Sequence, residues 1–295
     1  MKHATPLRTI LGGALVAILY AAPVHAQTRT WVTGSGGSDA NPCSRTAPCQ
    51  TFAGALSKTS AGGEINCIDA GGYGSVTINK SITIDCTGTF GSILASGVNG
   101  VTVNTAGVKV ILRGLSIGGA GTGLNGVNYL AGTEVTVEKV SIFGFTGNAI
   151  NMSLTASGNL KVIDATLNNS ARGIRATTTS GFAVAQVHNT AFNRMSVNGV
   201  EAAANGFVSV DHSSFLGNPT AVTATGVVSF LNVTNSLVTN NTTAFNAAAG
   251  ATLRISGNKI FDNTTAFAGT IQTGADNKTA GNGAGGTLAG GVATQ

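Results

Sequence analysis

The residues with the clearest chemical potential are two histidines and several carboxylates spaced about two dozen residues apart. With one lysine, they are Glu138, Lys139, Asp164, His188, Asp211 and His212. A carboxylate beside a histidine can form an acid–base pair, because the negative charge moves the imidazole pKa toward working pH. Since these residues are far apart in the sequence, this chemistry requires a fold that stacks them one above another.

The chain repeats itself at a matching interval. The segment VTNSLVTNNTTAF (233–245) recurs as ISGNKIFDNTTAF (255–267), 22 residues later. Small-plus-apolar pairs continue the series upstream at intervals of 22 to 26 residues: Gly123-Leu124, Ala149-Ile150, Gly173-Ile174, Gly199-Val200, Ala221-Val222, Ala244-Phe245 and Ala266-Phe267. Two further apolar series precede them: Ile117, Ile142, Leu167, Phe192, Phe215, Val238 and Ile260, and Val137, Val162, Val187, Val210, Val233 and Ile255.

Three apolar positions per repeat indicate three short strands that face a common interior, and stacking the repeats pairs each strand with its counterpart in the next coil. The sequence therefore predicts an all-β fold, a three-sided right-handed parallel β-helix with about 22–26 residues per coil. The 42 glycines and the charged fraction of 9% fit many strands and turns. A leucine-rich repeat has a similar period but needs dense leucine, where this chain uses Val, Ile and Phe.

Alignment of the repeats predicts which polar residues become neighbours. One column contains Glu138, Ile163, His188, Asp211 and Thr234, and the next contains Lys139, Asp164, Asn189, His212 and Asn235. Adjacent coils lie about 4.8 Å apart, so the ionisable residues would form one patch. We interpret the patch as a candidate site for catalysis; the alternative is a solvated row of turns with compensating charges.

Further binding candidates are Lys139 and the pair Arg172 and Arg175, which flank Gly173-Ile174. Two arginines on an extended sheet could hold an acidic sugar, and surface solvation is the alternative. With one Trp and three Tyr, we expect little aromatic surface for stacking against sugars.

Asn218, Asn241 and Asn263 each precede the second member of a small-plus-apolar pair by four residues. This pattern predicts a structural asparagine ladder, with left-handed backbone angles at a tight bend and amides paired between coils.

Residues 1–26 read as a signal peptide, with basic residues Lys2 and Arg8, an apolar run and a Val-His-Ala cleavage site. We expect cleavage near Ala26, a secreted (extracellular or periplasmic) protein and no membrane span after cleavage. Loss of Lys2 and Arg8 lowers the net charge from +5 to +3. Because no basic run is present, we expect no nucleic-acid partner.

The remaining chain divides into an N-terminal cap (27–64), the β-helix (65–282) and a Gly/Ala-rich tail (283–295). In PCQTFAGALSKT (48–59), Thr51 is a plausible N-cap, and Phe52, Ala53 and Leu56 lie at helical spacing. We predict that this short helix covers the first coil.

The four cysteines are Cys43, Cys49, Cys67 and Cys86, and an exported chain favours disulfides. Of the three possible pairings we favour Cys43–Cys49 with Cys67–Cys86. Without a C-x-x-C pair or a nearby histidine we expect no zinc at these cysteines, and we expect no metal or cofactor elsewhere.

The segment RTWVTGSGGSDANPCSRTAPCQTFAGALSKTSAGGEINCIDAGGYGSVTI (29–78) resembles the start of secreted β-helix proteins of the pectin-lyase-like superfamily, and with the repeats the resemblance covers 29–282. Pectate lyases of this fold use clustered acidic calcium ligands with an Arg or Lys base, and related hydrolases use grouped aspartates. Neither set is evident, because the carboxylates are scattered singly. The resemblance therefore transfers no catalytic residue.

The leading hypothesis is a secreted scaffold that binds a polysaccharide or cell-surface partner without catalysis. A second is a lyase or glycoside hydrolase acting on uronate-rich glycans. A third is a structural subunit of a surface assembly, for which oligomeric state is the discriminating property.

Overall fold

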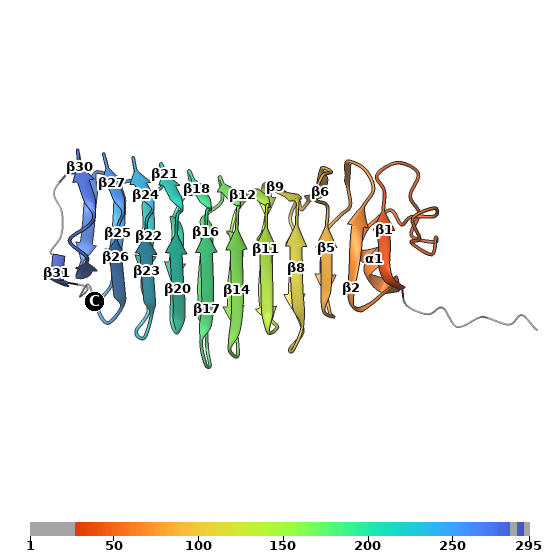
Figure 1. The fold of residues 1–295 in the computed structure, drawn as a ribbon, viewed down its shortest axis with the longest axis horizontal. Coiled ribbons are helices and arrows are strands. Elements are labelled where there is room, and N and C mark those ends of the chain that lie inside the picture. Colours follow the sequence, from red (N-terminus) through yellow and green to blue (C-terminus); the bar gives the residue numbers. More distant parts are fainter. Residues whose placement is uncertain (1–26, 284–287, 292–295) are drawn as a thin grey trace, which may run out of the picture.

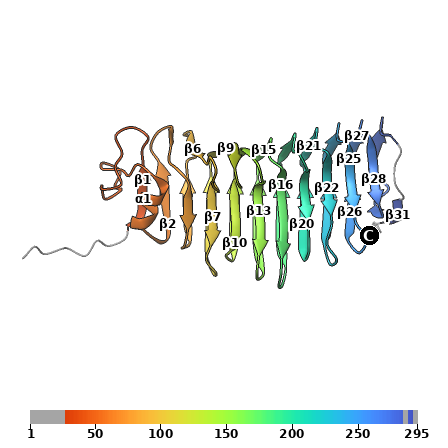
Figure 2. The ribbon, with the colours of Figure 1, turned by 180° about the vertical axis from the view of Figure 1, so that it is seen from behind.

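A computed structural model describes residues 27–283 and 288–291; the predicted signal peptide (1–26) lies outside these residues. The chain forms a long stack of coils, with β1 (Gln27–Val32) and the helix α1 (Phe52–Lys58) at one end and β31 (Leu288–Gly291) at the other (Figure 1). Each complete coil crosses three sheets, A, B and C, whose strand pairs are all parallel (Figures 1 and 2). The predicted three-sided parallel β-helix is confirmed.

Sheet A has twelve strands within the described residues. They are β1 (Gln27–Val32), β2 (Thr59–Cys67), β5 (Ile82–Asp85), β8 (Lys109–Arg113), β11 (Glu134–Glu138), β14 (Gly158–Ile163), β17 (Ala183–His188), β20 (Gly206–Asp211), β23 (Phe230–Thr234), β26 (Thr252–Ser256), β29 (Ile271–Thr273) and β31 (Leu288–Gly291). The third predicted apolar series, from Val137 to Ile255, lies in register in this sheet.

Sheet B follows sheet A in each coil and has ten strands in the described part of the chain. They are β3 (Gly71–Gly72), β6 (Gly91–Leu94), β9 (Leu115–Gly123), β12 (Ser141–Phe145), β15 (Thr166–Asn168), β18 (Ala191–Asn193), β21 (Ser214–Leu216), β24 (Leu237–Thr239), β27 (Lys259–Phe261) and β30 (Lys278–Ala280). The series from Ile117 to Ile260 is buried here, strand upon strand.

Sheet C completes the coil with nine described strands. They are β4 (Val76–Ile78), β7 (Val101–Asn104), β10 (Val127–Ala131), β13 (Asn148–Leu154), β16 (Arg172–Thr178), β19 (Asn198–Ala202), β22 (Thr220–Ala224), β25 (Thr243–Ala247) and β28 (Thr265–Gly269). The partner of Ile150 is Val127, so the predicted pair Gly123-Leu124 is wrong and Gly126-Val127 takes its place. Leu124 is 49% exposed.

The interior is filled by side chains of the same kind from successive coils. The rings of Phe192 and Phe215 stack with centroids 4.7 Å apart and planes 4° apart. Both rings are fully buried. A Cβ at Gly199 would lie 2.7 Å from the Phe215 ring and 2.5 Å from the Ala221 carbonyl oxygen. Glycine at this position therefore makes room for a phenylalanine in the interior.

The corner between sheets B and C carries the asparagine ladder. The Asn218 amide donates to Asn241 (2.9 Å), and the Asn241 amide donates to Asn263 (3.0 Å). The predicted left-handed angles do not occur at these residues. They occur one residue earlier, at Gly217, Asn240 and Asp262 (φ 67°, 54° and 54°). The bend thus belongs to the preceding residue, and the buried asparagine that follows satisfies backbone donors.

Helix α1 lies against the first coils, with the Phe52 and Tyr73 ring centroids 5.0 Å apart. Thr51 caps the helix by accepting a hydrogen bond from the Gly54 amide (2.9 Å). The expectation that Ala53 faces the interior is wrong. Ala55 is buried instead, beside Phe52 and Leu56, and Ala53 is exposed.

The predicted cap and tail both contribute strands. Strand β1 pairs with β2 at the start of sheet A, and β31 pairs with β29 at its other end. Residues 284–287 and 292–295 of the expected tail lie outside the described residues. In the part of the chain that is described, no helix has the length and apolarity needed to cross a bilayer.

Both favoured disulfides are present, Cys43–Cys49 and Cys67–Cys86. Cys67 ends β2, and Cys86 directly follows β5, the strand that pairs with β2. The second disulfide therefore joins adjacent coils at the corner between sheets A and B. Its Cα atoms are 4.8 Å apart, which is the ordinary spacing of neighbouring strands.

Candidate functional site

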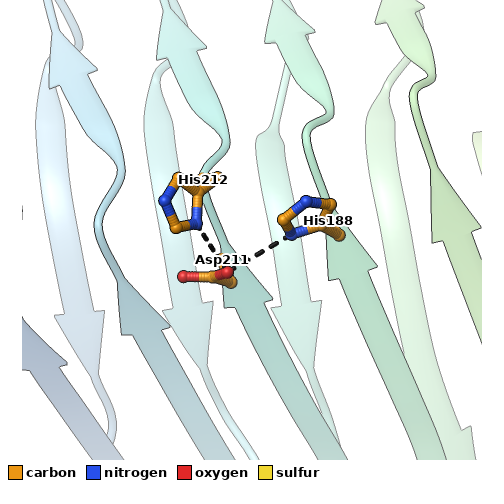
Figure 3. A group of neighbouring side chains, drawn as sticks. All are labelled: His188, Asp211 and His212. Carbon is orange, nitrogen blue, oxygen red and sulfur yellow. Dashed lines mark hydrogen bonds and ion pairs between the residues drawn. The ribbon is translucent and has the colours of Figure 1, made fainter.

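Two histidines and one aspartate meet at the corner between sheets A and B. His188 is the last residue of β17, and its partner in the register is Asp211, the last residue of β20. His212 is the first corner residue after Asp211. Figure 3 shows the two imidazole rings on either side of the Asp211 carboxylate. We call these three residues the His–Asp–His cluster.

Both imidazoles approach the same carboxylate oxygen. Asp211 Oδ2 lies 2.6 Å from His212 Nδ1 and 3.3 Å from His188 Nδ1. The ring centroids of the two histidines are 5.5 Å apart. Each of the three residues has one potential metal-ligand atom that lies within 4.8 Å of the corresponding atoms of the other two. The arrangement can share protons or hold a cation.

The second oxygen of Asp211 is held from the next coil. Oδ1 accepts hydrogen bonds from Thr234 Oγ1 (2.8 Å) and from the Asn235 side-chain amide (3.0 Å). Burial by itself raises the pKa of Asp211, but the hydrogen bonds from His212, Asn235 and Thr234 outweigh burial and hold this pKa below its usual value. The carboxylate is therefore ionised and fixed in orientation.

The backbone of this corner has one geometry in successive coils. Its first residue is left-handed, with φ between 47° and 54°, at Lys139, Asp164, Asn189, His212 and Asn235. The backbone N–H of Asn189 donates to the Asp211 carbonyl oxygen, and that of His212 to the Thr234 carbonyl oxygen. Asn, Asp and His tolerate this conformation better than most residues. The polar residue types found here therefore suit the turn as well as the chemistry.

A second ladder lies directly beneath the cluster. Ser213 Oγ accepts from the Thr190 backbone N–H (3.1 Å), and Ser236 Oγ accepts from the Ser213 backbone N–H (3.1 Å). Asn258 continues the series by accepting from Ser236 (3.0 Å). Because Thr190, Ser213, Ser236 and Asn258 are all buried, these bonds fix the backbone that carries His188, Asp211 and His212.

The predicted patch is divided, and part of it lies away from the cluster. Glu138 forms an ion pair with Arg113 (2.7 Å), and Ile163 separates Glu138 from His188 in the column. The Asp164 carboxylate accepts a hydrogen bond from the Asn189 amide (2.7 Å). Lys139 is exposed at the corner, one coil before Asp164. His188, Asp211 and His212 are brought together; Glu138 and Lys139 are not.

Arg172 and Arg175 lie on sheet C and converge on one carboxylate. Their Nε atoms lie 2.6 Å and 3.8 Å from the oxygens of Glu201, whose side chain is 11% exposed. Asn198 and Thr225 also contact this carboxylate. The expected arginine pair is therefore already occupied by a neighbour from the next coil.

Two open depressions of about 300 Å³ each flank the His–Asp–His cluster. The one on the sheet A side is lined by Lys161, Ile163, Gln186, Val187, His188, Ser209 and Asp211. The one on the sheet B side is lined by Asp164, Ala165, Thr166, Asn189, Thr190, Ala191, His212 and Ser214. Most of the side chains that line them are polar. His188 and Asp211 thus line the first depression, and His212 lines the second.

An aromatic row, formed by Phe182, Phe207 and Phe230, lies on the same coils at the opposite ends of the sheet A strands. Neighbouring ring centroids are 4.7 Å and 4.8 Å apart, and Arg254 lies 5.7 Å from the Phe230 centroid. This row was not predicted, because only Trp and Tyr were counted as residues that could stack against sugars. The signal was available, since Phe207 and Phe230 are one period apart.

The comparisons with known proteins bear on the fold. The sequence matches no protein-family model and no curated protein sequence. Pectate lyase Pel9A is similar in structure, with a TM-score of 0.67 and 14% identity over 86% of this chain and 78% of that chain.

A rhamnogalacturonan lyase has a TM-score of 0.48 and 12% identity, covering 83% of this chain and 72% of that chain. The GH136 lacto-N-biosidase from Eubacterium ramulus has a TM-score of 0.46 and 10% identity, covering 90% of this chain and 68% of that chain. The likeness to Pel9A, together with the three parallel sheets, shows that this chain has the fold of a right-handed parallel β-helix.

Proposed function

We propose that the chain binds a polysaccharide or cell-surface glycan without cleaving it, on the outer face of the sheet A strands β14, β17, β20 and β23 and on the adjoining corner with sheet B. The observation that carries the proposal is the pair of depressions beside the His–Asp–His cluster. Their hydroxyl, amide, imidazole and charged groups offer the donors and acceptors that recognise sugar hydroxyls.

The aromatic row supports the same face. Phe207 and Ser209 alternate with buried residues along β20, so both point outward with Asp211. Phe182 is 50% exposed. Sugar rings combine apolar C–H faces with polar rims, and a ligand lying along these strands would contact aromatic rings at one end and polar groups at the other.

The state of the carboxylates favours binding over catalysis. A general acid for glycosidic cleavage has to carry a proton at working pH, which requires a raised pKa. Asp211 has a lowered pKa, and hydrogen bonds engage both of its oxygens. Glu138, the other carboxylate of its column in the patch, is paired with Arg113.

A glycan array of neutral and acidic polysaccharides, followed by calorimetry on the hits, tests the proposal. Gln186 is exposed in the sheet A depression, so Gln186→Trp should fill that depression and weaken binding at least tenfold. Thr136→Trp is the matched control, because Thr136 occupies the same column two coils away. It should leave binding unchanged.

Three outcomes would overturn the proposal. The first is an array without any bound glycan. The second is equal loss of binding in both tryptophan variants. The third is release of unsaturated or reducing sugar from uronate-rich glycans, with or without calcium, which would replace binding by catalysis.

A further inference from the structure

We propose that the His–Asp–His cluster binds a divalent transition-metal ion, with Zn²⁺ as the reference ion. One potential ligand atom from each of the three residues lies within 4.8 Å of the other two. The candidate ligands are His188 Nδ1, Asp211 Oδ2 and His212 Nδ1, since both Nδ1 atoms approach the same carboxylate oxygen. This inference is independent of the proposed glycan binding, because it concerns the cluster and an ion alone.

The separations of the ligand atoms suit a small ion. In a tetrahedral site with ligands about 2.1 Å from Zn²⁺, neighbouring ligand atoms lie roughly 3.4 Å apart. Asp211 Oδ2 lies 3.3 Å from His188 Nδ1 and 2.6 Å from His212 Nδ1. An ion would replace the two hydrogen bonds, and the shorter contact would have to lengthen. The His212 side chain is 59% exposed and has room for that rotation.

The cluster also has the supporting contacts that metal sites need. Thr234 and Asn235 hold the other oxygen of Asp211, which orients the carboxylate toward the two imidazoles. The register between β17 and β20 fixes His188 opposite Asp211. Buried bonds from Thr190 to Ser213 and from Ser213 to Ser236 hold the backbone beneath. The ligands therefore project from a rigid frame.

The ligand types indicate the class of ion. Two imidazole nitrogens and one carboxylate oxygen suit Zn²⁺, Ni²⁺ or Cu²⁺, whereas Ca²⁺ and Mg²⁺ require a shell of oxygen ligands. His188 is 55% exposed and Asp211 38% exposed. An ion can thus enter from solvent, and its remaining coordination positions would face the solvent between the two depressions.

The test is calorimetric titration of the full chain, purified without a polyhistidine tag, with a zinc salt alone. We expect one ion per chain, with His188→Ala and His212→Ala each weakening binding at least tenfold. Asp262→Asn is the control. Asp262 is an exposed carboxylate with left-handed backbone angles, like His212, but it lies at the corner between sheets B and C and outside the His–Asp–His cluster. It should bind zinc as the parent does, and excess Ca²⁺ or Mg²⁺ should not displace the zinc.

The ring signals of His188 and His212 should shift together in NMR spectra on addition of zinc. Thermal melting of each variant without metal separates loss of a ligand from loss of the fold. The inference is overturned if Zn²⁺, Ni²⁺ and Cu²⁺ all fail to bind, or if binding survives both histidine substitutions. The glycan-binding assay is repeated in the presence of a chelator to distinguish the two proposals. Glycan binding that persists without metal would support the proposed function whatever the outcome of the zinc titration.

Discussion

The side-chain amide of Asn218 donates to Asn241 across one coil, at 2.9 Å. Asn241 Oδ1 also accepts from the backbone N–H of Asn218, at 2.9 Å. The buried side-chain oxygen of Asn241 thus accepts from both the backbone and the side-chain nitrogen of Asn218. Asn263 Oδ1 accepts in the same way from both nitrogens of Asn241.

Asn241→Ala should lower the free energy of unfolding by about 3 kcal/mol, because it leaves buried donors of Asn218 without a partner. Chemical denaturation measures the loss. The neighbouring Thr242 is exposed, so Thr242→Ala should stay within about 0.5 kcal/mol of the parent. Equal effects of the two substitutions would contradict the structural role of the ladder.

Phe215→Ala should lower the free energy of unfolding by about 3–5 kcal/mol, since it opens a cavity beside Phe192 in the interior. Phe143 is 41% exposed in sheet B, and Phe143→Ala is the matched control, with an expected loss below about 1 kcal/mol. Denaturation of both variants gives the comparison. A small loss at Phe215 would mean that the ring is not enclosed.

The double variant Cys67→Ser with Cys86→Ser should have a free energy of unfolding about 3 kcal/mol lower than that of the parent, because the disulfide closes a chain segment 19 residues long. The Cys43–Cys49 disulfide closes a separation of only 6 residues. Cys43→Ser with Cys49→Ser should therefore lower the free energy of unfolding by about 1 kcal/mol less than the first double variant does, according to the loop-entropy model. Thermal unfolding of the two variants measures the order. The reverse order would show that local packing, and not loop length, dominates.

The lowered pKa of Asp211 predicts an acid-dependent contribution to stability. Because the folded-state pKa is below the unfolded value of about 3.9, the contribution is present above that pH and is lost as pH falls toward the folded-state pKa. The stability difference between the parent and Asp211→Asn should therefore narrow from pH 7 to pH 3. Gln186→Ala removes no ionisable group, and its difference from the parent should stay constant over this range.

The two described tyrosines should not ionise near pH 10 in the folded protein. Burial raises the pKa of Tyr129 to about 12, and burial with the hydrogen bond to Asp69 raises the pKa of Tyr73 further. Raised pKa values stabilise the fold below pH 10 and cease to do so as pH rises through the folded-state values. Phenolate absorbance in a Tyr20→Phe variant should appear together with unfolding. A titration at pH 10 with the fold intact would contradict the burial of both rings.

The repeat period was sufficient to predict the columns of sheets A and B residue by residue. This succeeded because the A–B corner has two residues in each coil from Glu138 to Lys259, as between Glu138 and Ser141 or between Asp211 and Ser214. The constant length keeps both sheets in one register. The Val series and the meeting of His188 with Asp211 follow from that register.

Other predictions failed where two residues satisfied the same pattern. Gly123-Leu124 and Gly126-Val127 are both small-plus-apolar pairs, and the pairing of Val127 with Ile150 decides between them. A column also does not specify side-chain partners. Extending it one coil upstream would have placed Arg113 beside Glu138. Aligning sheet C would have placed Glu201 beside Arg175.

Differences in coil length collect at the corner between sheets C and A. Six residues separate Ala176 from Ala183 there, but only three separate Ala202 from Gly206, although both ends pair in register. This corner therefore absorbs insertions without shifting the opposite edge. A duplicated coil placed outside residues 183–235 would lengthen the molecule by one strand spacing and leave the His–Asp–His cluster unchanged. A gene for such a protein can therefore lengthen by duplication of a coil without altering the corner that holds these three residues.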